Sequence, residues 1–202
     1  MTKTVTTELK AYNFNFDDFI LSSLPPLALN SRAAGQSFMH DLAREGDVLS
    51  AEVMFESGTP IDIPNDIGRH PLHEAAAFGQ MEMVKFLLDC GAEADAPVQP
   101  LGHTALYLAV EGSWHDIARH LIKHGASLAV TDALLGTGLL HAAAAKGDML
   151  MAGILIAAGA DIFHADKKGM TARDTAERHG HKNLSHTLLK VMEHHARHHA
   201  AA

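Results

Sequence analysis

The sequence predicts an all-α fold, a solenoid of stacked helix pairs joined by short finger-like hairpin loops. Three series of small residues support this prediction, because each recurs every 33 or 34 residues. The first series is Gly58, Gly91, Gly125 and Gly159. The second is Gly35, Gly68, Gly102, Gly136 and Gly169, and the third is Gly46, Gly79, Gly147 and Gly180 with Ser113 in the missing place. Such periods are typical of proteins whose units pack only on their neighbours.

The composition also favours packed helices. Apolar residues make up 47% of the 202-residue chain and aromatic residues only 5%, so the core must consist mainly of Leu, Ile, Met, Val and Ala. A chain rich in Ala and Leu prefers helices to strands. Its length suits one compact domain or one short repeat array.

The first helix of each unit has recognisable start and stop signals. Pro71 suits a first helical turn, where its missing N–H costs nothing. The N-cap hydroxyls expected to accept a free helix N–H are Ser37, Thr104 and Thr171. His70 and Gly138 replace Thr at this position, so those two caps are expected to be weaker. We expect Gly79 and Gly147 to end first helices, and Gly91, Gly125 and Gly159 to end second helices, through positive φ angles.

The second helices each show one apolar face. The spacing i, i+1, i+4, i+5 repeats in three units and is typical of an amphipathic helix. The core positions are Met83, Val84, Leu87 and Leu88, then Ile117, Ala118, Leu121 and Ile122, then Met151, Ala152, Leu155 and Ile156. A single unit cannot bury this face, so the units are expected to stack.

The clearest copy of the repeat resembles a known family. It reads Gly-Arg-His-Pro-Leu-His-Glu-Ala-Ala over residues 68–76, followed by Gly79, Leu87-Leu88 and Gly91-Ala92. This resembles the ankyrin repeat, and the resemblance covers about residues 32–193. The five implied units are residues 32–64, 65–98, 99–132, 133–165 and 166–193, of which the first and last are degenerate, as capping repeats are.

Two segments lie outside these units. Residues 1–31 form an N-terminal arm or capping segment whose stretch 12–21 is apolar and acidic. Either a short helix covers the edge of the first repeat there, or an arm binds a partner or the array's own groove. Residues 194–202 form a His-rich tail, which is expected to be a solvated helix end.

Charge and targeting signals restrict the partners and the compartment. The net charge is −8, with −5 over residues 1–64, −4 over 65–131 and +1 over 132–202. This acidic balance argues against nucleic acid, whose binding needs basic groups. No signal peptide or membrane-spanning run is evident, and Cys90 is the only cysteine. We therefore expect a cytoplasmic protein that is monomeric when unbound and has no membrane partner, and export without a signal stays open.

No catalytic, cofactor-binding or metal-binding constellation is found. His40, His73 and His141 occupy the His position of the repeat, and the resemblance implies that they bond to backbone or Thr groups near the fingers. Two further histidines, His120 and His124, have the i, i+4 spacing of one helix face and are expected to face solvent. Because a nucleophilic cysteine needs a paired base, Cys90 is interpreted as a packed residue.

The resemblance implies a non-enzymatic protein-binding module, an adaptor or an inhibitor of a partner protein, that binds through its finger tips and first helices. The alternative is a His-rich metal- or pH-responsive binding protein. Apolar finger tips in register predict an interaction surface, because tips that meet only water should be polar. The candidate partner-binding residues are Asp66, Ile67, Arg69, Phe78, Leu101, His103, Glu111, Trp114, Leu134, Leu135 and Lys146. Phe78, Trp114 and Arg69 are of the types that dominate binding energy.

Overall fold

The computed structural model describes residues 32–199, with the side chains of residues 38–197. The expected N-terminal arm, residues 1–31, lies outside the described residues. Within the described part, the chain forms five pairs of α-helices. They are α3 (Arg32–Glu45) and α4 (Val48–Glu56), α5 (Pro71–Ala77) and α6 (Met81–Asp89), α7 (Ala105–Gly112) and α8 (His115–Lys123), α9 (Leu139–Lys146) and α10 (Met149–Ala157), and α11 (Ala172–Arg178) and α12 (Lys182–His199).

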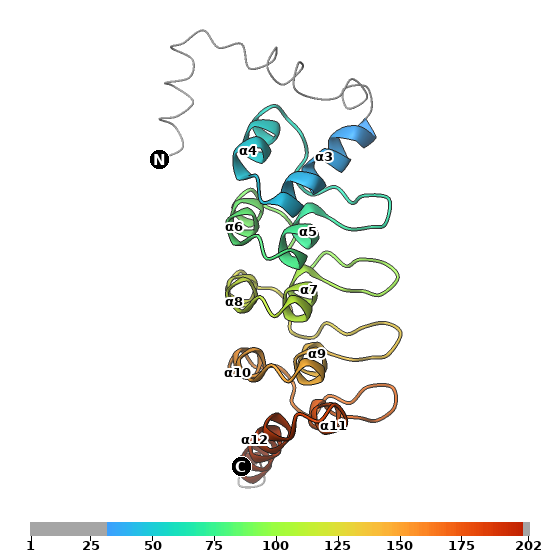
Figure 1. The fold of residues 1–202 in the computed structure, drawn as a ribbon, viewed down its shortest axis with the longest axis vertical. Coiled ribbons are helices and arrows are strands. Elements are labelled where there is room, and N and C mark those ends of the chain that lie inside the picture. Colours follow the sequence, from blue (N-terminus) through green and yellow to red (C-terminus); the bar gives the residue numbers. More distant parts are fainter. Residues whose placement is uncertain (1–31, 200–202) are drawn as a thin grey trace.

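The helix pairs stack in chain order into one elongated array (Figure 1). The first helices, α3, α5, α7, α9 and α11, form one column, in which each packs on the next. The second helices, α4, α6, α8, α10 and α12, form the other column, and the fingers project on the side of the first helices. The predicted all-α solenoid is confirmed.

Hydroxyl caps begin two of the first helices, as expected. Thr104 Oγ1 accepts the N–H of Tyr107 at 3.4 Å, and Thr171 forms a reciprocal capping box with Asp174. The expected cap at Ser37 is wrong, because α3 begins at Arg32 and residue 37 lies inside the helix.

Where Thr is missing, the histidine of the first helix completes the cap. The N–H of His70 donates to Nδ1 of His73 at 3.0 Å, and the N–H of Gly138 donates to Nδ1 of His141 at 3.3 Å. Because Nδ1 accepts, Nε2 carries the proton, and His73 Nε2 donates to the carbonyl oxygen of Ala96 at 2.9 Å. The ring therefore joins the helix start to the following finger.

The helix ends follow the glycine series. Gly79 and Gly147 adopt φ angles of +78° and +70°, two residues after the end of α5 and directly after α9, respectively. Ser113 takes the same left-handed conformation, with φ 59°, where the series lacks a glycine. The period therefore has a local backbone cause, because each turn between paired helices needs one left-handed residue.

The core lies between the two columns and between successive pairs. Met83, Val84 and Leu87 of α6 are fully buried, and the corresponding residues of α8 and α10 are buried too. The fourth position of the expected set is different, since Leu88, Ile122 and Ile156 are only half-buried. One residue further along a helix is about 100° further round its axis, which turns these side chains toward the outer edge.

The fingers and the last helix complete the architecture. Isolated antiparallel bridges join Val98 to His103, Thr131 to Gly138 and Ala165 to Thr171, and no longer strand occurs among residues 32–199. Helix α12 continues past residue 194, the expected start of the tail, to His199. In the part of the chain that the structure describes, no helix has the length and apolarity to cross a membrane.

Candidate partner-binding surface

An aspartate shapes the tip of the finger that precedes α9. Asp132 Oδ1 accepts the N–H of Leu134 at 2.9 Å and that of Leu135 at 2.7 Å. These bonds close a tight turn around the carboxylate. The two leucine side chains are left facing solvent at the tip.

The same device recurs in two other fingers. Asn65 Oδ1 accepts the N–H groups of Ile67 and Arg69 at 3.1 and 3.0 Å. Asp166 Oδ1 accepts those of Lys168 and Met170 at 2.8 and 2.9 Å. Val98 occupies the corresponding place before α7, because it makes the same backbone bonds to His103 and Gly102, and it has no side-chain acceptor for the tip.

The other oxygen of Asp132 reaches the neighbouring finger. His103 Nε2 lies 2.9 Å from Asp132 Oδ2, and the His103 ring stacks on Tyr107 with 4.0 Å between ring centroids. Burial favours a neutral Asp132 carboxyl, but the N–H groups of Leu135 and Leu134 and the His103 ring outweigh it. The pKa of Asp132 therefore lies below its usual range. His103, a candidate partner contact, thus serves mainly to connect two fingers.

Four of the candidate apolar residues are exposed. Ile67, Leu134 and Leu135 at the tips expose 64%, 67% and 53% of their surface, and Phe78 at the end of α5 exposes 51%. Leu101 differs from its expected exposure, because it is half-buried between neighbouring fingers, where its carbonyl oxygen accepts the N–H of Ala133. Exposed apolar groups in register are thus retained at two of the three tips.

A hollow between the fingers and the first helices gathers candidates from two successive units. It measures about 400 Å³ and lies between the fingers and helices α7, α9 and α11. Leu135 reaches it from a finger tip, and Glu111 and Lys146 reach it from the ends of α7 and α9. Ala142 and Ala145 leave its floor open because their side chains are small.

The candidates at the other end of the array surround a buried acid. Glu74 of α5 lies 3.5 Å from the guanidinium groups of both Arg44 and Arg69. Arg44 also lies over the Phe78 ring, 5.6 Å from its centroid. Arg69 and Phe78 are therefore held in place by charges within the chain, and the exposed Asp66 lies at the tip beside them.

Trp114 has an internal role that the sequence did not predict. Its indole Nε1–H donates to the carbonyl oxygen of Ala77 in the preceding unit at 3.1 Å. A Cβ added at Gly79 would lie 2.7 Å from the ring, so the ring lies directly on that glycine. Trp114 is partly exposed, but it is first a contact between two repeats.

Similar contacts join every successive pair of units from the first to the last. The carbonyl oxygen two residues before the left-handed residue accepts a side-chain bond from the next unit. The donor–acceptor pairs are Gln80 to Arg44, Trp114 to Ala77, Lys146 to Glu111 and His181 to Ala145. Sequence reasoning missed these contacts because the donors share no residue type. The only signal in the sequence for these contacts is that three of the four donor residues directly follow the left-handed residue of their own unit.

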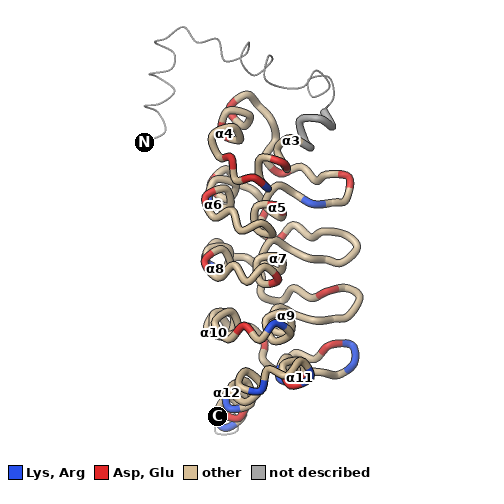
Figure 2. Tube along the Cα trace, in the orientation of Figure 1, with Lys and Arg blue, Asp and Glu red and all other residues tan. Residues whose placement is uncertain are grey.

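Charges are distributed unevenly along the array (Figure 2). Acidic residues lie on α4, α6 and α8 and on several of the fingers, whereas the finger before α11 carries two neighbouring lysines, Lys167 and Lys168. Lys167 Nζ donates to the carbonyl oxygen of Ala133 in the preceding finger at 2.6 Å. The surface between the fingers and the first helices is therefore more basic at the end that holds Leu135.

The histidines do not gather into a metal site in the described region. No group of three or more His, Cys, Asp or Glu side chains converges among the described residues. His141 Nε2 donates to the carbonyl oxygen of Met170 at 2.9 Å, which matches the role implied for this position. Cys90 is half-buried, and burial raises the pKa of its thiol. The His-rich alternative therefore gains no support from this region.

Comparison with known protein families agrees with this geometry. A family model described as "Ankyrin repeats (3 copies)" matches residues 39–132, and one described as "Ankyrin repeat" matches residues 136–167. The chain belongs to the ankyrin-repeat family. Ankyrin repeats generally mediate protein–protein interaction, and the family is typically non-enzymatic.

Three curated relatives illustrate the range of ankyrin-repeat proteins that are similar to the chain. The mouse nuclear factor NF-kappa-B p105 subunit is 36% identical over 63% of this chain and 13% of its own length. The probable 26S proteasome regulatory subunit p28 of Saccharomyces cerevisiae is 32% identical over 64% of this chain and 57% of its own length. The L-asparaginase of Dirofilaria immitis is 31% identical over 84% of this chain and 28% of its own length. The chain thus spans less than two thirds of each relative.

Proposed function

We propose that this ankyrin-repeat chain holds a partner protein, as an adaptor or an inhibitor, and performs no catalysis of its own. The observation that carries the proposal is the exposure of Ile67, Leu134, Leu135 and Phe78 along the groove side of the array. Each of these side chains is held at a tip or helix end whose backbone is already hydrogen bonded within the chain. A partner therefore meets a preformed surface, which lowers the ordering cost of binding.

The exposure of the candidates suggests that some of them contact the partner and that others hold the fingers and units in position. Ile67, Phe78, Leu134 and Leu135 supply the apolar contact, and Asp66, Glu111 and Lys146 supply charges at its edge. Leu101, His103, Trp114 and Arg69 act chiefly by holding the fingers and units in position. The proposed site is thus narrower than the set that the sequence suggested.

The test is a comparison of matched variants in affinity capture from the native lysate, with the captured proteins identified by mass spectrometry. Leu134→Asp combined with Leu135→Asp should leave the helical circular dichroism unchanged and weaken capture of a stoichiometric partner at least tenfold, about 1.4 kcal/mol. Leu49→Asp is the control, because Leu49 is exposed on α4 in the other helix column. Equal capture by the double variant and the wild type would remove these tips from the site.

A further inference from the structure

The outer face of α10 lacks the charges that α6 and α8 carry at the corresponding positions. The second residue of each helix is Glu82 in α6, Asp116 in α8 and Leu150 in α10. Three residues further on, α6 has Lys85 and α8 has Arg119, whereas α10 has Gly153. Four residues beyond these, α6 has Asp89 and α8 has Lys123, whereas α10 has Ala157. Leu150 exposes 53% of its surface, and Met149 beside it is exposed too. The chain thus leaves one helix apolar on the side that faces away from the core.

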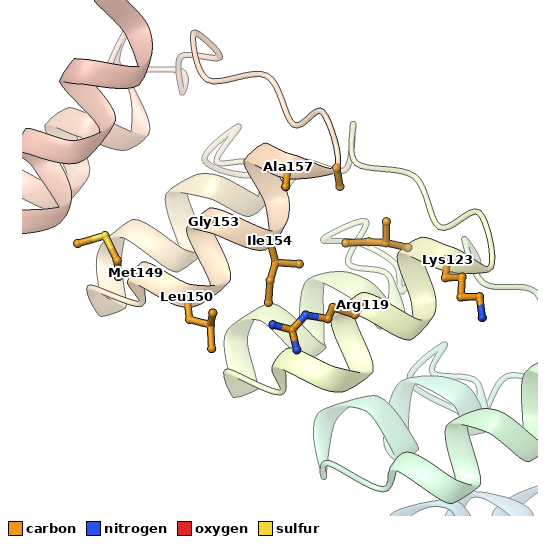
Figure 3. Close-up of a pocket in the computed structure, with 9 residues that line it drawn as sticks. Arg119, Lys123, Met149, Leu150, Gly153, Ile154 and Ala157 are labelled. Carbon is orange, nitrogen blue, oxygen red and sulfur yellow. The ribbon is translucent and has the colours of Figure 1, made fainter. Parts of the chain in front are cut away.

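This face forms one wall of an open groove between α8 and α10 (Figure 3). The groove measures about 770 Å³. Leu150 and Ile154 point into it from α10, and Arg119 and Lys123 line the α8 side. Arg119 is paired with Asp116 at 2.9 Å, whereas Lys123 makes no ion pair among the described residues. One wall is therefore apolar and neutral, and the other carries the unpaired Lys123 beside Arg119, whose charge Asp116 partly offsets.

Gly153 is the least expected residue of this wall. A glycine inside a helix is unfavourable, and it is usually retained where another backbone approaches closely. Nothing in the chain lies within 4 Å of a Cβ added at Gly153, so internal packing does not require it. Gly91, by contrast, also has open space but needs its positive φ of 90°. The space over Gly153 is available to an external group.

We propose that this groove is a second docking surface, and that it binds a helix of a partner protein whose apolar ridge is flanked by acidic residues. The apolar ridge would lie on Leu150, Gly153 and Ile154, and carboxylates along one edge would face Arg119 and Lys123. A helix fits better than an extended segment, because both walls are helices whose backbone groups are already bonded. An extended segment would find no backbone partners there, whereas a helix satisfies its own.

The groove is separate from the surface proposed above. Its lining comes from the second helices, whereas the tips and hollow belong to the fingers and first helices. The two surfaces can therefore be occupied at once, one on each column of the array. This proposal stands or falls independently of the binding site at the tips.

The experiment measures binding of two synthetic helical peptides to the full chain by fluorescence anisotropy. Both peptides carry leucine and alanine on one face, and they have glutamate or lysine at the edges of that face. The glutamate peptide should bind at least tenfold more tightly at low salt, and the difference should shrink as salt screens the charges. Arg119→Glu with Lys123→Glu should reverse the preference.

Matched variants test whether the glutamate peptide binds in this groove. Leu150→Asp should weaken its binding at least tenfold, and Leu49→Asp, at the corresponding position of α4, should leave it within twofold. Gly153→Glu should also abolish binding while the chain stays folded, since it replaces a poor helix former. Leu134→Asp with Leu135→Asp should have no effect, so failure of the tip site cannot be mistaken for failure here. Equal binding of both peptides, or binding that survives Leu150→Asp and Gly153→Glu, would overturn the proposal.

Discussion

The indole N–H of Trp114 donates to the carbonyl oxygen of Ala77, 3.1 Å away and one repeat earlier in the array. The ring covers Gly79, the left-handed residue that ends α5. A side-chain bond thus reinforces the joint between two repeats at the point where the chain turns. Between the other successive repeats, the corresponding bonds to a carbonyl oxygen come from the side chains of Gln80, Lys146 and His181.

The Trp114 contact should make Gly79 less tolerant of substitution than Gly91. Both glycines have positive φ, and alanine in that conformation costs about 1–2 kcal/mol. A Cβ at Gly79 also overlaps the Trp114 ring, whereas none of the chain lies near a Cβ at Gly91. Gly79→Ala should therefore lower the free energy of unfolding by about 1–3 kcal/mol more than Gly91→Ala. Urea denaturation measures both.

The excess should disappear once the ring is removed. In a Trp114→Ala background, Gly79→Ala and Gly91→Ala should cost similar amounts, because the overlapping group is gone. An unchanged excess would mean that the Trp114 ring is not the source of the intolerance. Trp114→Phe alone should cost about 1 kcal/mol through loss of the bond to Ala77.

Leu87 should contribute more to stability than its neighbour Leu88. Leu87 is completely buried between α6 and the neighbouring helices, and Leu88 is half-buried at the edge. Leu87→Ala should lower the free energy of unfolding by about 2–5 kcal/mol, and Leu88→Ala by about half as much. Chemical denaturation of the two variants provides the comparison. A larger loss of stability for Leu88→Ala than for Leu87→Ala would contradict the orientation of α6, in which Leu87 faces the core and Leu88 its edge.

His73 should make stability depend on pH between about 4 and 6.5. Burial is the main cause that lowers the pKa of His73 to about 4, from 6.5 in the unfolded chain. The unfolded state binds the proton first as pH falls, so stability is complete above 6.5 and declines by about 3 kcal/mol by pH 4. His73→Gln should flatten this part of the profile, measured as urea midpoints over pH 4–8. NMR titration of the His73 ring should give the low pKa directly.

Asp132 should be needed for the shape of the tip that carries Leu134 and Leu135. Its carboxylate accepts both N–H groups and contacts His103. Asp132→Ala should lower the free energy of unfolding by about 1–3 kcal/mol, because these partners lose their acceptor. The amides of Leu134 and Leu135 should also exchange hydrogen faster. Asp66→Ala is the matched control at an exposed tip, and an equal effect there would refute the assignment.

The sequence alone determined the repeat architecture. The all-α repeat fold, the turns and most of the helix starts could be predicted because they depend on local backbone preferences. Gly79 and Gly147 are required where φ is positive, and Thr104 and Thr171 cap helices with their own hydroxyls. Ser113 also takes its place in the glycine series, as the register predicted. The one misplaced cap, Ser37, lies in a degenerate first unit, where the repeat pattern is weakest.

Only the tertiary structure decided what the side chains of neighbouring units do to one another. It turned Trp114 and His103 from expected partner contacts into links between units and fingers, and it half-buried Leu101. These outcomes depend on groups about 30 or more residues apart, such as His103 with Asp132, that meet only after the units stack. A periodic pattern shows which positions are equivalent, but it does not show which atoms face each other across a joint. That pairing depends on packing distance and side-chain length, which are set when the array is assembled.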